Sequence, residues 1–210
     1  MRENGVGNVA LVLLAAGDSR RFHGNKLLSI FQGKAMYRHI VDQVSQLPEG
    51  FFCRKILVTQ YPEIAEDLGN EGYEVVENHE SHLGISHSIH LALKTLGTPA
   101  GSAELAEPAE LAVAAEADAV CFAVCDQPWL RRATIEALFE TWEKSGQGLA
   151  CLCHQGNFGN PAVFERQYWA ELMELQGDVG GKRVLRRHLD DLCLCEVEDG
   201  KELVDIDVRQ

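Results

Sequence analysis

The 210-residue sequence is short of positive charge: 19 lysines and arginines stand against 32 aspartates and glutamates, and the formal net charge is −13. We therefore expect no nucleic-acid partner, because a protein that binds a phosphate backbone needs a broad basic surface. A small phosphorylated ligand remains compatible with this charge. Such an anion needs only a local cluster of cations and backbone N–H groups.

The sequence also lacks a long hydrophobic run. The apolar stretch 9–16 falls short of the roughly 18 residues that a membrane-spanning helix requires. It has neither the basic leader nor the cleavage site of a signal peptide. We therefore expect no membrane segment and a cytoplasmic location.

The cysteines give no sign of a disulfide framework, because they are seven in number and no export signal accompanies them. Two Cys-x-Cys pairs, Cys151/Cys153 and Cys193/Cys195, suggest either a metal site or buried strand residues. Each pair lies in a short apolar run, and free cysteine is commonly buried. We predict that both pairs belong to the hydrophobic core.

Strand-like and helix-like patterns alternate along the sequence. The expected strands are 9–14, 55–60, 73–77, 119–125, 148–153, 192–197 and 203–206. The expected helices are 35–47, 62–69, 86–96, 132–144, 166–175 and 181–190. Buried strands that alternate with helices predict an α/β protein: a three-layer, Rossmann-like fold whose mostly parallel sheet carries helices on both faces.

We expect a single domain over residues 1–210. The stretch 97–118 is rich in Ala, Glu, Gly and Pro and has little apolar periodicity, so it is predicted to be a flexible acidic insertion. In sheets of this class, ligands bind beyond the carboxyl ends of the strands. The loops after 9–14 and 119–125 are therefore the first places to expect a site.

The first of these loops, LAAGDSRRFHGNK at residues 14–26, combines small and basic residues. Gly17 allows a close approach of the backbone to a ligand, and successive N–H groups can form an anion-binding nest. Arg20, Arg21 and Lys26 add positive charge that suits a triphosphate. The loop matches neither GxGxxG nor the Walker A spacing. Residue types alone leave two interpretations open, a phosphate loop and a tight turn beside a solvated basic patch.

Six segments, in order along the chain, resemble motifs of the nucleotidyltransferases related to the molybdenum cofactor guanylyl- and cytidylyltransferases. They are residues 14–26, 84–89 (GISHSI), 124–130 (VCDQPWL), 159–164 (GNPAVF), 177–182 (GDVGGK) and 205–207 (DID). The resemblance covers nearly the whole chain and implies the Rossmann-like nucleotidyltransferase fold. Two positions depart from the family pattern: His23 stands in place of a glycine, and Lys182 replaces the more usual arginine and so lacks its bidentate fork.

The resemblance also implies an activity. Guanylyltransferases of the family usually carry LAGG, whereas pyrimidine-nucleotide enzymes carry AAG, and Ala16 occupies the discriminating position. The implied reaction moves CMP from CTP to molybdopterin with Mg²⁺ as cofactor and releases pyrophosphate, with a molybdenum hydroxylase as a transient partner. The alternatives are GTP or a sugar-phosphate acceptor on the same fold, and a non-catalytic carrier of the molybdenum cofactor. The absent dinucleotide glycine pattern disfavours an oxidoreductase.

The resemblance implies roles for single residues as well. The expected catalytic residues are Lys26 at the α-phosphate, Arg21 at the β- and γ-phosphates, and Asp126. The residues expected to bind the nucleotide are Leu14, Ala15, Ala16, Gly17, Arg21, Lys26, Gly84, Ser86 and Ser88. The residues expected to bind the acceptor are Gly159, Asn160, Gly177, Asp178 and Lys182.

Asp126 and Asp207 are the predicted Mg²⁺ ligands, because this cation prefers oxygen. Plainer interpretations exist for both: Asp126 as a turn residue before Gln-Pro, and Asp207 as a charge at a strand end, with Asp205 competing for its role. Lys26 and Arg21 are by residue type more often surface residues.

Two further features of the second motif have structural explanations. Ser86 is also a candidate N-cap for helix 86–96. His82, His87 and His90 raise the question of a metal site, but no Cys or His partner motif supports one. We expect these histidines to be solvated or to lie on a helix surface.

Overall fold

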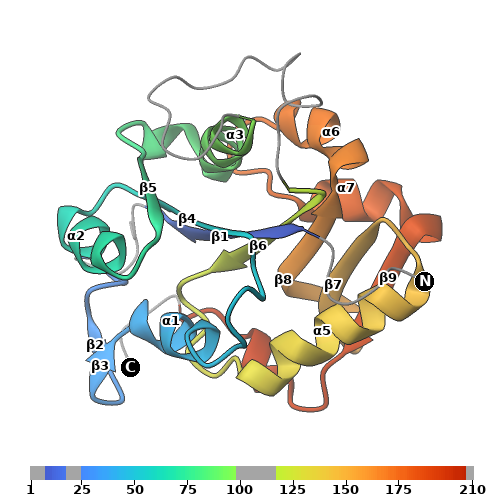
Figure 1. Cartoon of the computed structure of the whole chain (residues 1–210), viewed down its shortest axis with the longest axis horizontal. Coiled ribbons are helices and arrows are strands. Elements are labelled where there is room, and N and C mark those ends of the chain that lie inside the picture. Colours follow the sequence, from blue (N-terminus) through green and yellow to red (C-terminus); the bar gives the residue numbers. More distant parts are fainter. Residues whose placement is uncertain (1–7, 18–24, 98–116, 207–210) are drawn as a thin grey trace.

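The structure of the protein, a computed structural model, describes residues 8–17, 25–97 and 117–206. A seven-stranded sheet in the order β5-β4-β1-β6-β8-β7-β9 crosses its centre (Figure 1). The strands are β1 (Val9–Ala15), β4 (Arg54–Thr59), β5 (Glu74–Glu77), β6 (Ala119–Val124), β7 (Leu149–His154), β8 (Asn157–Glu165) and β9 (Leu192–Glu196). Within this sheet only β8 runs antiparallel to its neighbours, so the expected mostly parallel sheet is confirmed.

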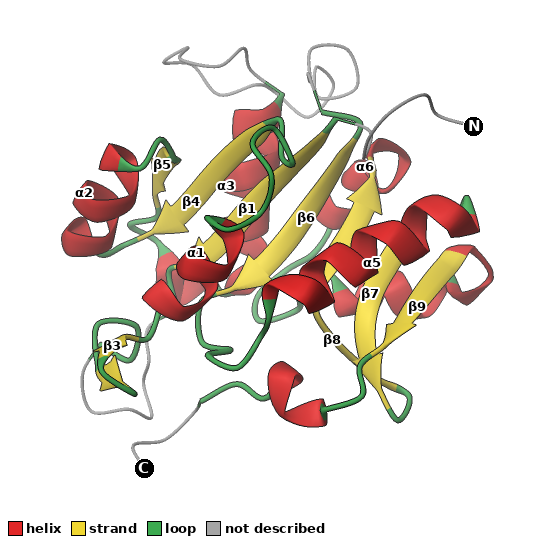
Figure 2. Cartoon of the chain, turned by 60° about the horizontal axis from the view of Figure 1, so that its bottom comes forward, coloured by secondary structure: helices red, strands yellow, loops and turns green. Residues whose placement is uncertain are grey.

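Helices cover both faces of the sheet. On one face lie α1 (Arg38–Val44), α2 (Pro62–Asn70) and α5 (Arg132–Ser145). On the other lie α3 (Ile85–Leu96), α6 (Trp169–Met173) and α7 (Lys182–Arg187). Figure 2 shows α1 and α5 in front of the sheet and α3 behind it. The predicted three-layer α/β fold is confirmed.

The alternation of side chains along β1 explains why two cores form. Leu11 and Leu13 point into the core beneath α1, α2 and α5, whereas Ala10 and Val12 point into the core beneath α3, α6 and α7. All four are at most 1% exposed. Each fully buried leucine of this kind stabilises the fold by about 1.5–3 kcal/mol.

A small hairpin precedes α1 and corrects the expected start of that helix. The predicted helix 35–47 begins only at Arg38, because β2 (Ile30–Phe31) and β3 (Lys34–Ala35) pair as a separate two-stranded sheet. Gln32 and Gly33 turn the chain between these strands with φ angles of 47° and 88°. Positive φ at both central residues is typical of a tight two-residue hairpin turn.

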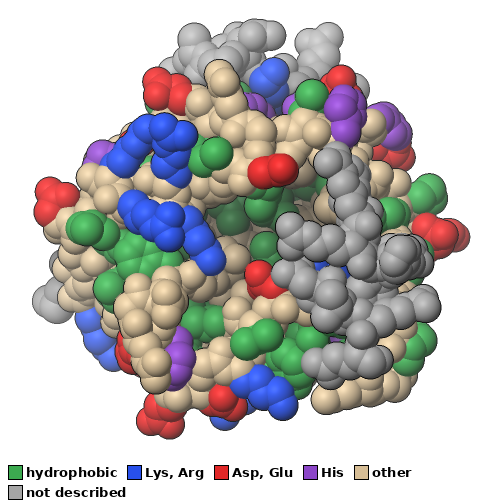
Figure 3. All heavy atoms as spheres, turned by 180° about the vertical axis from the view of Figure 1, so that it is seen from behind, with side chains coloured by type: hydrophobic (Ala, Val, Ile, Leu, Met, Phe, Trp, Pro, Cys, Tyr) green, Lys and Arg blue, Asp and Glu red, His purple; other side chains and the backbone are tan. Residues whose placement is uncertain are grey.

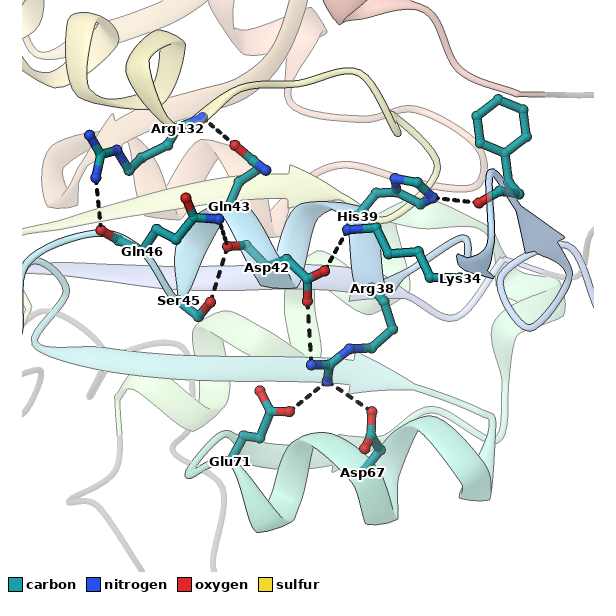
Figure 4. A network of polar contacts seen from close by, with 11 residues as sticks. Lys34, Arg38, His39, Asp42, Gln43, Ser45, Gln46, Asp67, Glu71 and Arg132 are labelled. Carbon is teal, nitrogen blue, oxygen red and sulfur yellow. Dashed lines mark hydrogen bonds and ion pairs between the residues drawn. The ribbon is translucent and has the colours of Figure 1, made fainter.

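Polar contacts fix α1 in place (Figure 4). Arg38 Nη1 donates to Glu71 Oε1 at 2.6 Å and to Asp67 Oδ2 at 3.0 Å. His39 Nε2 lies 2.9 Å from the carbonyl oxygen of Phe31, and the backbone N–H of Arg132 donates to Gln43 Oε1 at 2.8 Å. These contacts tie α1 to α2, to the hairpin and to the start of α5.

The strand β8 was not predicted. Gly159 and Pro161 interrupt its apolar pattern, and both residue types are ordinary turn signals. The structure accommodates them through a cis Asn160–Pro161 bond and a register shift between Cys151 and Cys153 on the neighbouring β7.

The predicted strand 203–206 is wrong. Gly200–Leu203 instead form a 3₁₀ helix, η4, and residues 204–206 belong to no strand. The reason is Glu202, which is 2% exposed and accepts hydrogen bonds from the Arg131 backbone N–H at 3.1 Å and from the Thr134 hydroxyl. These bonds hold the segment against the start of α5 and away from a sheet edge.

Two further 3₁₀ helices take up parts of predicted α-helices: η2 (Arg166–Tyr168) and η3 (Leu189–Asp191). As a result, the predicted helices 166–175 and 181–190 are reduced to the α6 and α7 segments flanked by such turns. A third, η1 (Ser81–Leu83), lies just before α3 and outside every predicted helix. The predicted insertion lies almost wholly outside the described residues.

The prediction that the Cys-x-Cys pairs are core residues is confirmed. Cys151 packs in the core on one face of the sheet and Cys193 and Cys195 in the core on the other, so the pairs do not form one site. Burial raises the pKa of Cys151 to about 12. In the described ranges, no cluster of three or more His, Cys, Asp or Glu is placed to hold a metal. Nor is any helix there long and apolar enough to cross a membrane.

Candidate active site

A cavity of about 320 Å³ opens beyond the carboxyl ends of β1 and β6. Its lining residues are Leu14, Ala16, Gly17, Lys26, Leu27, Ser81, Gly84, Ile85, Ser88, Val124, Cys125, Asp126 and Asp178. Figure 3 shows a hollow on this side of the molecule with hydrophobic and acidic side chains around it. The cavity lies where the sheet rule predicts a ligand site, because β1 and β6 are neighbours and end at the same edge.

Lys26 and Asp126 meet in this cavity. The Lys26 Nζ lies 2.7 Å from Asp126 Oδ2, and the two side chains are only 12% and 19% exposed. The second carboxylate oxygen, Asp126 Oδ1, is buried and has no hydrogen-bond partner within the described residues. A buried carboxylate oxygen without a donor is costly. This oxygen is therefore suited to a ligand or a cation.

The turn after the first loop presents Lys26 to the cavity. The Asn25 Oδ1 accepts hydrogen bonds from the backbone N–H groups of Leu27 at 3.0 Å and Leu28 at 3.4 Å. The Ser29 hydroxyl donates to the Lys26 carbonyl oxygen at 2.6 Å. Asn25, which stands where the Walker A pattern has a glycine before its lysine, thus closes a local turn. This turn keeps the backbone of Lys26 in place.

Cys125 precedes Asp126 and lines the same cavity. Burial raises the pKa of its thiol, and the neighbouring Asp126 carboxylate raises it further. The thiol therefore stays protonated at neutral pH and serves as an apolar wall. It is not poised as a nucleophile or a thiolate ligand.

Gly84 and Gly177 are in close backbone contact. Gly84 has φ +91°, and a Cβ there would lie 2.3 Å from the carbonyl carbon of Gly177. The Ser86 N–H donates to the Gly177 carbonyl oxygen at 3.1 Å. Asp178, the next residue, lines the cavity. The resemblance assigned Gly177 and Asp178 to the acceptor, yet the structure places them against the segment expected to bind the nucleotide.

Ser86 and Ser88 have different surroundings. The predicted N-cap role of Ser86 is wrong, because α3 already begins at Ile85 and Gly84 is its N-cap residue. Ser88 lines the cavity, and its Oγ accepts a hydrogen bond from Asn78 Nδ2 at 2.9 Å. Asn78 is fully buried, and its Oδ1 accepts from the Glu80 N–H at 3.0 Å.

Asn78 was missed by the sequence reasoning. It follows β5, so its place at the end of a strand was the available signal. The end of β4 holds further residues of this kind, Thr59, Gln60 and Tyr61, whose side chains donate to the backbone of the first loop.

The remaining acceptor candidates lie outside the cavity lining. Gly159 packs against Leu203, where a Cβ would lie 2.7 Å from a leucine methyl group. Asn160 precedes the cis bond of β8, whose ladder with β6 starts two residues later, at Ala162. Lys182 is exposed at the start of α7. In Figure 3, Lys and Arg side chains gather on one flank of the hollow.

Two predicted residues, Arg21 and Asp207, lie outside the described residues. The neighbour of Asp207 does not: the Ile206 N–H donates to the Asp126 carbonyl oxygen at 3.0 Å. Asp205, the competitor for the metal role, accepts a hydrogen bond from Gln127 Nε2 at 2.9 Å. The C-terminal segment therefore runs directly beside the end of β6.

The three histidines near Gly84 do not come together as a metal site. His82 is exposed, and His87 Nε2 lies 3.7 Å from Glu80 Oε2. His90 is half-buried where α3 packs on α6, and burial lowers its pKa. His82 is exposed, as expected for a solvated histidine. His87 and His90 lie on α3, as expected, but their side chains are partly covered.

Comparisons with solved structures find the same fold in other proteins. A homologue of Mycobacterium tuberculosis Rv0371c from Mycobacterium sp. strain JC1 superposes with a TM-score of 0.71 and 23% identity, over 96% of this chain and 91% of that one. Rv0371C of Mycobacterium tuberculosis H37Rv, in complex with manganese, gives a TM-score of 0.66 and 20% identity over 90% and 88% of the two chains.

A third structure is molybdopterin-guanine dinucleotide biosynthesis protein A from Archaeoglobus fulgidus. Its TM-score is 0.60 at 17% identity, over 95% of this chain and 92% of that one. At such identities these likenesses establish the fold. A comparison with curated protein sequences gives no significant match.

Family membership follows from the sequence match, which covers most of the chain and all of the residues that line the cavity. Residues 11–192 match the MobA-like NTP transferase domain, from the first strand through α3 and β6 to the start of β9. The chain belongs to the family of MobA-like NTP transferases.

Proposed function

We propose that this protein transfers CMP from CTP to the terminal phosphate of molybdopterin and releases pyrophosphate. The observation that carries the proposal is the Lys26–Asp126 pair in the cavity, with one Asp126 oxygen buried and free of a described hydrogen-bond partner. The choice of CTP rests on Ala16 and the choice of acceptor on the motif resemblance.

The reaction is an in-line displacement. An oxygen of the acceptor phosphate attacks the α-phosphorus of CTP, and the bond from that phosphorus to the pyrophosphate oxygen breaks. A phosphate nucleophile is already ionised at neutral pH, so no general base is needed. The work of the protein is to position the two substrates and to stabilise developing negative charge.

Lys26 is the described cation best placed for that stabilisation, because its ammonium lies inside the cavity and is 12% exposed. When a triphosphate enters, the ammonium has an alternative anionic partner to Asp126. Arg21, which belongs to the same loop in the sequence, is proposed to hold the β- and γ-phosphates.

Asp126 offers a carboxylate oxygen that suits a hard divalent cation. Its Oδ1 is a buried carboxylate oxygen without a described donor, and hard cations prefer such oxygens. Asp207 is the second proposed ligand. Bound Mg²⁺ would neutralise charge on the triphosphate. The manganese complex of the mycobacterial protein supports a divalent cation in this fold.

The test is pyrophosphate release by purified protein with molybdenum-loaded molybdopterin and Mg²⁺, run in parallel with CTP, GTP, ATP and UTP. Release with CTP alone is the expected result. Release with GTP would keep the reaction and overturn the nucleotide assignment. Absence of release with all four, together with tight binding of molybdopterin, would replace the enzyme with a carrier.

A further inference from the structure

Three consecutive residues at the end of β4 contact the backbone at the start of the first loop. Their side chains donate hydrogen bonds to three consecutive backbone carbonyl oxygens, those of residues 15–17. The contacts join Thr59 Oγ1 to Ala15 (3.1 Å), Gln60 Nε2 to Ala16 (2.7 Å) and the Tyr61 hydroxyl to Gly17 (2.6 Å). We call this set the carbonyl clamp.

Thr59 anchors the clamp. Its side chain is buried, and its hydroxyl also accepts a hydrogen bond from the Tyr61 N–H at 3.1 Å. The same residue therefore uses its hydroxyl in both directions. This bond fixes the backbone that carries Gln60 and Tyr61, so the clamp is built from the sheet outward.

The clamp fixes the direction of N–H groups as well as carbonyls. In a trans peptide, the C=O of one residue and the N–H of the next point in opposite directions. The carbonyls of Ala15 and Ala16 are turned toward the end of β4, so the N–H groups of Ala16 and Gly17 are turned away from it. Because β1 lies between β4 and β6, these N–H groups face the side on which β6 ends.

The end of β6 is the site itself. Asp126 lies there, and Ala16 and Gly17 line the same cavity, whereas residues 59–61 are not among its lining residues. Two successive N–H groups on one side of a loop form an anion-binding concavity. The clamp therefore acts on a ligand only through the backbone of the loop.

We propose that Gln60 and Tyr61 are positioning residues that orient the N–H groups of Ala16 and Gly17 toward the anionic part of a bound nucleoside triphosphate. This inference rests on the proposed function and deepens it, because neither residue belongs to any of the six motif segments. In this proposal the loop needs a pair of donors from the end of β4 to present its backbone correctly.

The experiment measures nucleotide binding and turnover in two clamp variants. Tyr61→Phe removes one hydroxyl, and Gln60→Met removes the amide donor at similar length. Calorimetry with CTP, GTP, ATP and UTP, each with Mg²⁺ and without acceptor, gives Kd for the wild type and the variants. Loss of one net hydrogen bond should raise Kd and KM about 3- to 10-fold. We expect kcat to change less than about twofold, as for a loss of uniform binding.

Tyr37→Phe is the matched control. The Tyr37 hydroxyl donates to Asp67 Oδ2 at 2.6 Å, the same length as the Tyr61–Gly17 bond, and Tyr37 is not among the lining residues of the cavity. Both Tyr→Phe variants lose one hydroxyl and a 2.6 Å hydrogen bond, and Tyr61→Phe also removes the acceptor of a 3.4 Å hydrogen bond from Gln60 Nε2. A purely structural effect would lower the thermal midpoint in both and leave Kd alike.

The outcomes separate the two proposals. A higher Kd in Tyr61→Phe and Gln60→Met, with Kd within about twofold of wild type in Tyr37→Phe, supports the clamp. Equal Kd values in all of the proteins overturn it and leave the proposed function standing. If the wild type binds none of the four triphosphates, the proposed function is overturned and the clamp's role with it. Should Gln60→Met fail to fold, Tyr61→Phe alone still decides.

Discussion

Lys26 and Asp126 are separated by 100 residues in the sequence, and the Lys26 Nζ lies 2.7 Å from Asp126 Oδ2. Lys26 comes from the turn after the first loop and Asp126 from the end of β6, so the pair closes the gap between two neighbouring strand ends. Both side chains are mostly buried. Each is therefore held ready for a charged ligand.

Lys26→Met and Asp126→Asn should each lower kcat for pyrophosphate release by about 10²- to 10³-fold, because each removes a preorganised group at the site of charge development. The fold should survive with a loss of about 1–3 kcal/mol, the range for a charge-assisted hydrogen bond. The control is Lys34→Met, which breaks the half-exposed pair with Asp42 outside the cavity. Normal turnover in both site variants would contradict the site assignment.

Gly84→Ala should destabilise the protein by more than about 3 kcal/mol and weaken triphosphate binding, because the new Cβ would displace the backbone at Gly177. Gly72→Ala provides the matched control: its φ is +81°, but nothing lies within 4 Å of a Cβ there. We expect Gly72→Ala to cost about 1–2 kcal/mol from the backbone conformation alone. Denaturant unfolding and calorimetry measure both. Equal losses in the two variants would show that the contact with Gly177 is unimportant.

Asn78 and Ser88 should be energetically coupled. A double-mutant cycle with Asn78→Ala and Ser88→Ala should give a coupling free energy of about 1 kcal/mol in unfolding, because their side chains share a buried 2.9 Å hydrogen bond. Both single variants should also weaken triphosphate binding, since Ser88 lines the cavity. The control is Ser45→Ala, which removes an exposed hydroxyl that donates to the Asp42 carbonyl oxygen at 3.0 Å. Additive effects would refute the coupling.

Glu202→Gln should lower the free energy of unfolding by about 2–3 kcal/mol and leave kcat unchanged. The buried carboxylate accepts hydrogen bonds from the Arg131 backbone N–H, the Arg131 guanidinium and the Thr134 hydroxyl. Its negative charge therefore stabilises the N-terminus of α5. Glu140→Gln breaks an exposed pair with Lys144 and should cost less than about 0.5 kcal/mol. A large fall in kcat with unchanged stability would move Glu202 into the catalytic machinery.

His90 should make stability fall on acidification. Burial lowers its pKa, and repulsion from His87 and Lys94 lowers it further, although backbone contacts with Leu172 and Leu175 oppose the shift. The folded protein therefore binds this proton less readily than the unfolded chain, so stability present above about pH 6.5, the ordinary histidine pKa, is lost as pH falls through the folded value.

The measurement for His90 is the thermal midpoint of wild type and His90→Gln at pH 7.5 and pH 5.5. The wild-type midpoint should fall more than that of the variant over this interval. His82→Gln, at an exposed position, should follow the wild type. Parallel changes in wild type and His90→Gln would show that His90 does not carry the dependence.

Residue patterns predicted the layers and the strand ends at which the cavity lies, because both depend on burial. β1 is buried on both faces, and a continuous apolar run such as VALVLLA reports that directly. Asp126 was proposed because it follows an apolar strand closely, whereas Lys26 was singled out by the motif resemblance. The strand β8 was missed, because Gly159 and Pro161 interrupt its apolar pattern and both residue types are ordinary turn signals.

The carbonyl clamp could not be predicted for a different reason. Gln60 and Tyr61 donate to backbone carbonyl oxygens 44 residues away in the sequence. Every residue has such an oxygen, so the sequence does not indicate which one accepts a hydrogen bond. Asn78 escaped in the same way, since its partners are a serine hydroxyl and a backbone N–H. Polar residues that support a loop look like ordinary surface residues until the strands are placed side by side.

The reversed direction of β8 places the β7–β8 turn at the same edge of the sheet as the ends of β1 and β6. The strands β1 and β6 reach that edge with their last residues, whereas β8 reaches it with its first residues, just after the turn that joins it to β7. The β7–β8 turn can therefore change in length or composition without shifting β1 or β6. If the chain is the transferase proposed above, altering this hairpin would be a route to a new acceptor that leaves the proposed triphosphate site at β1 and β6 unchanged.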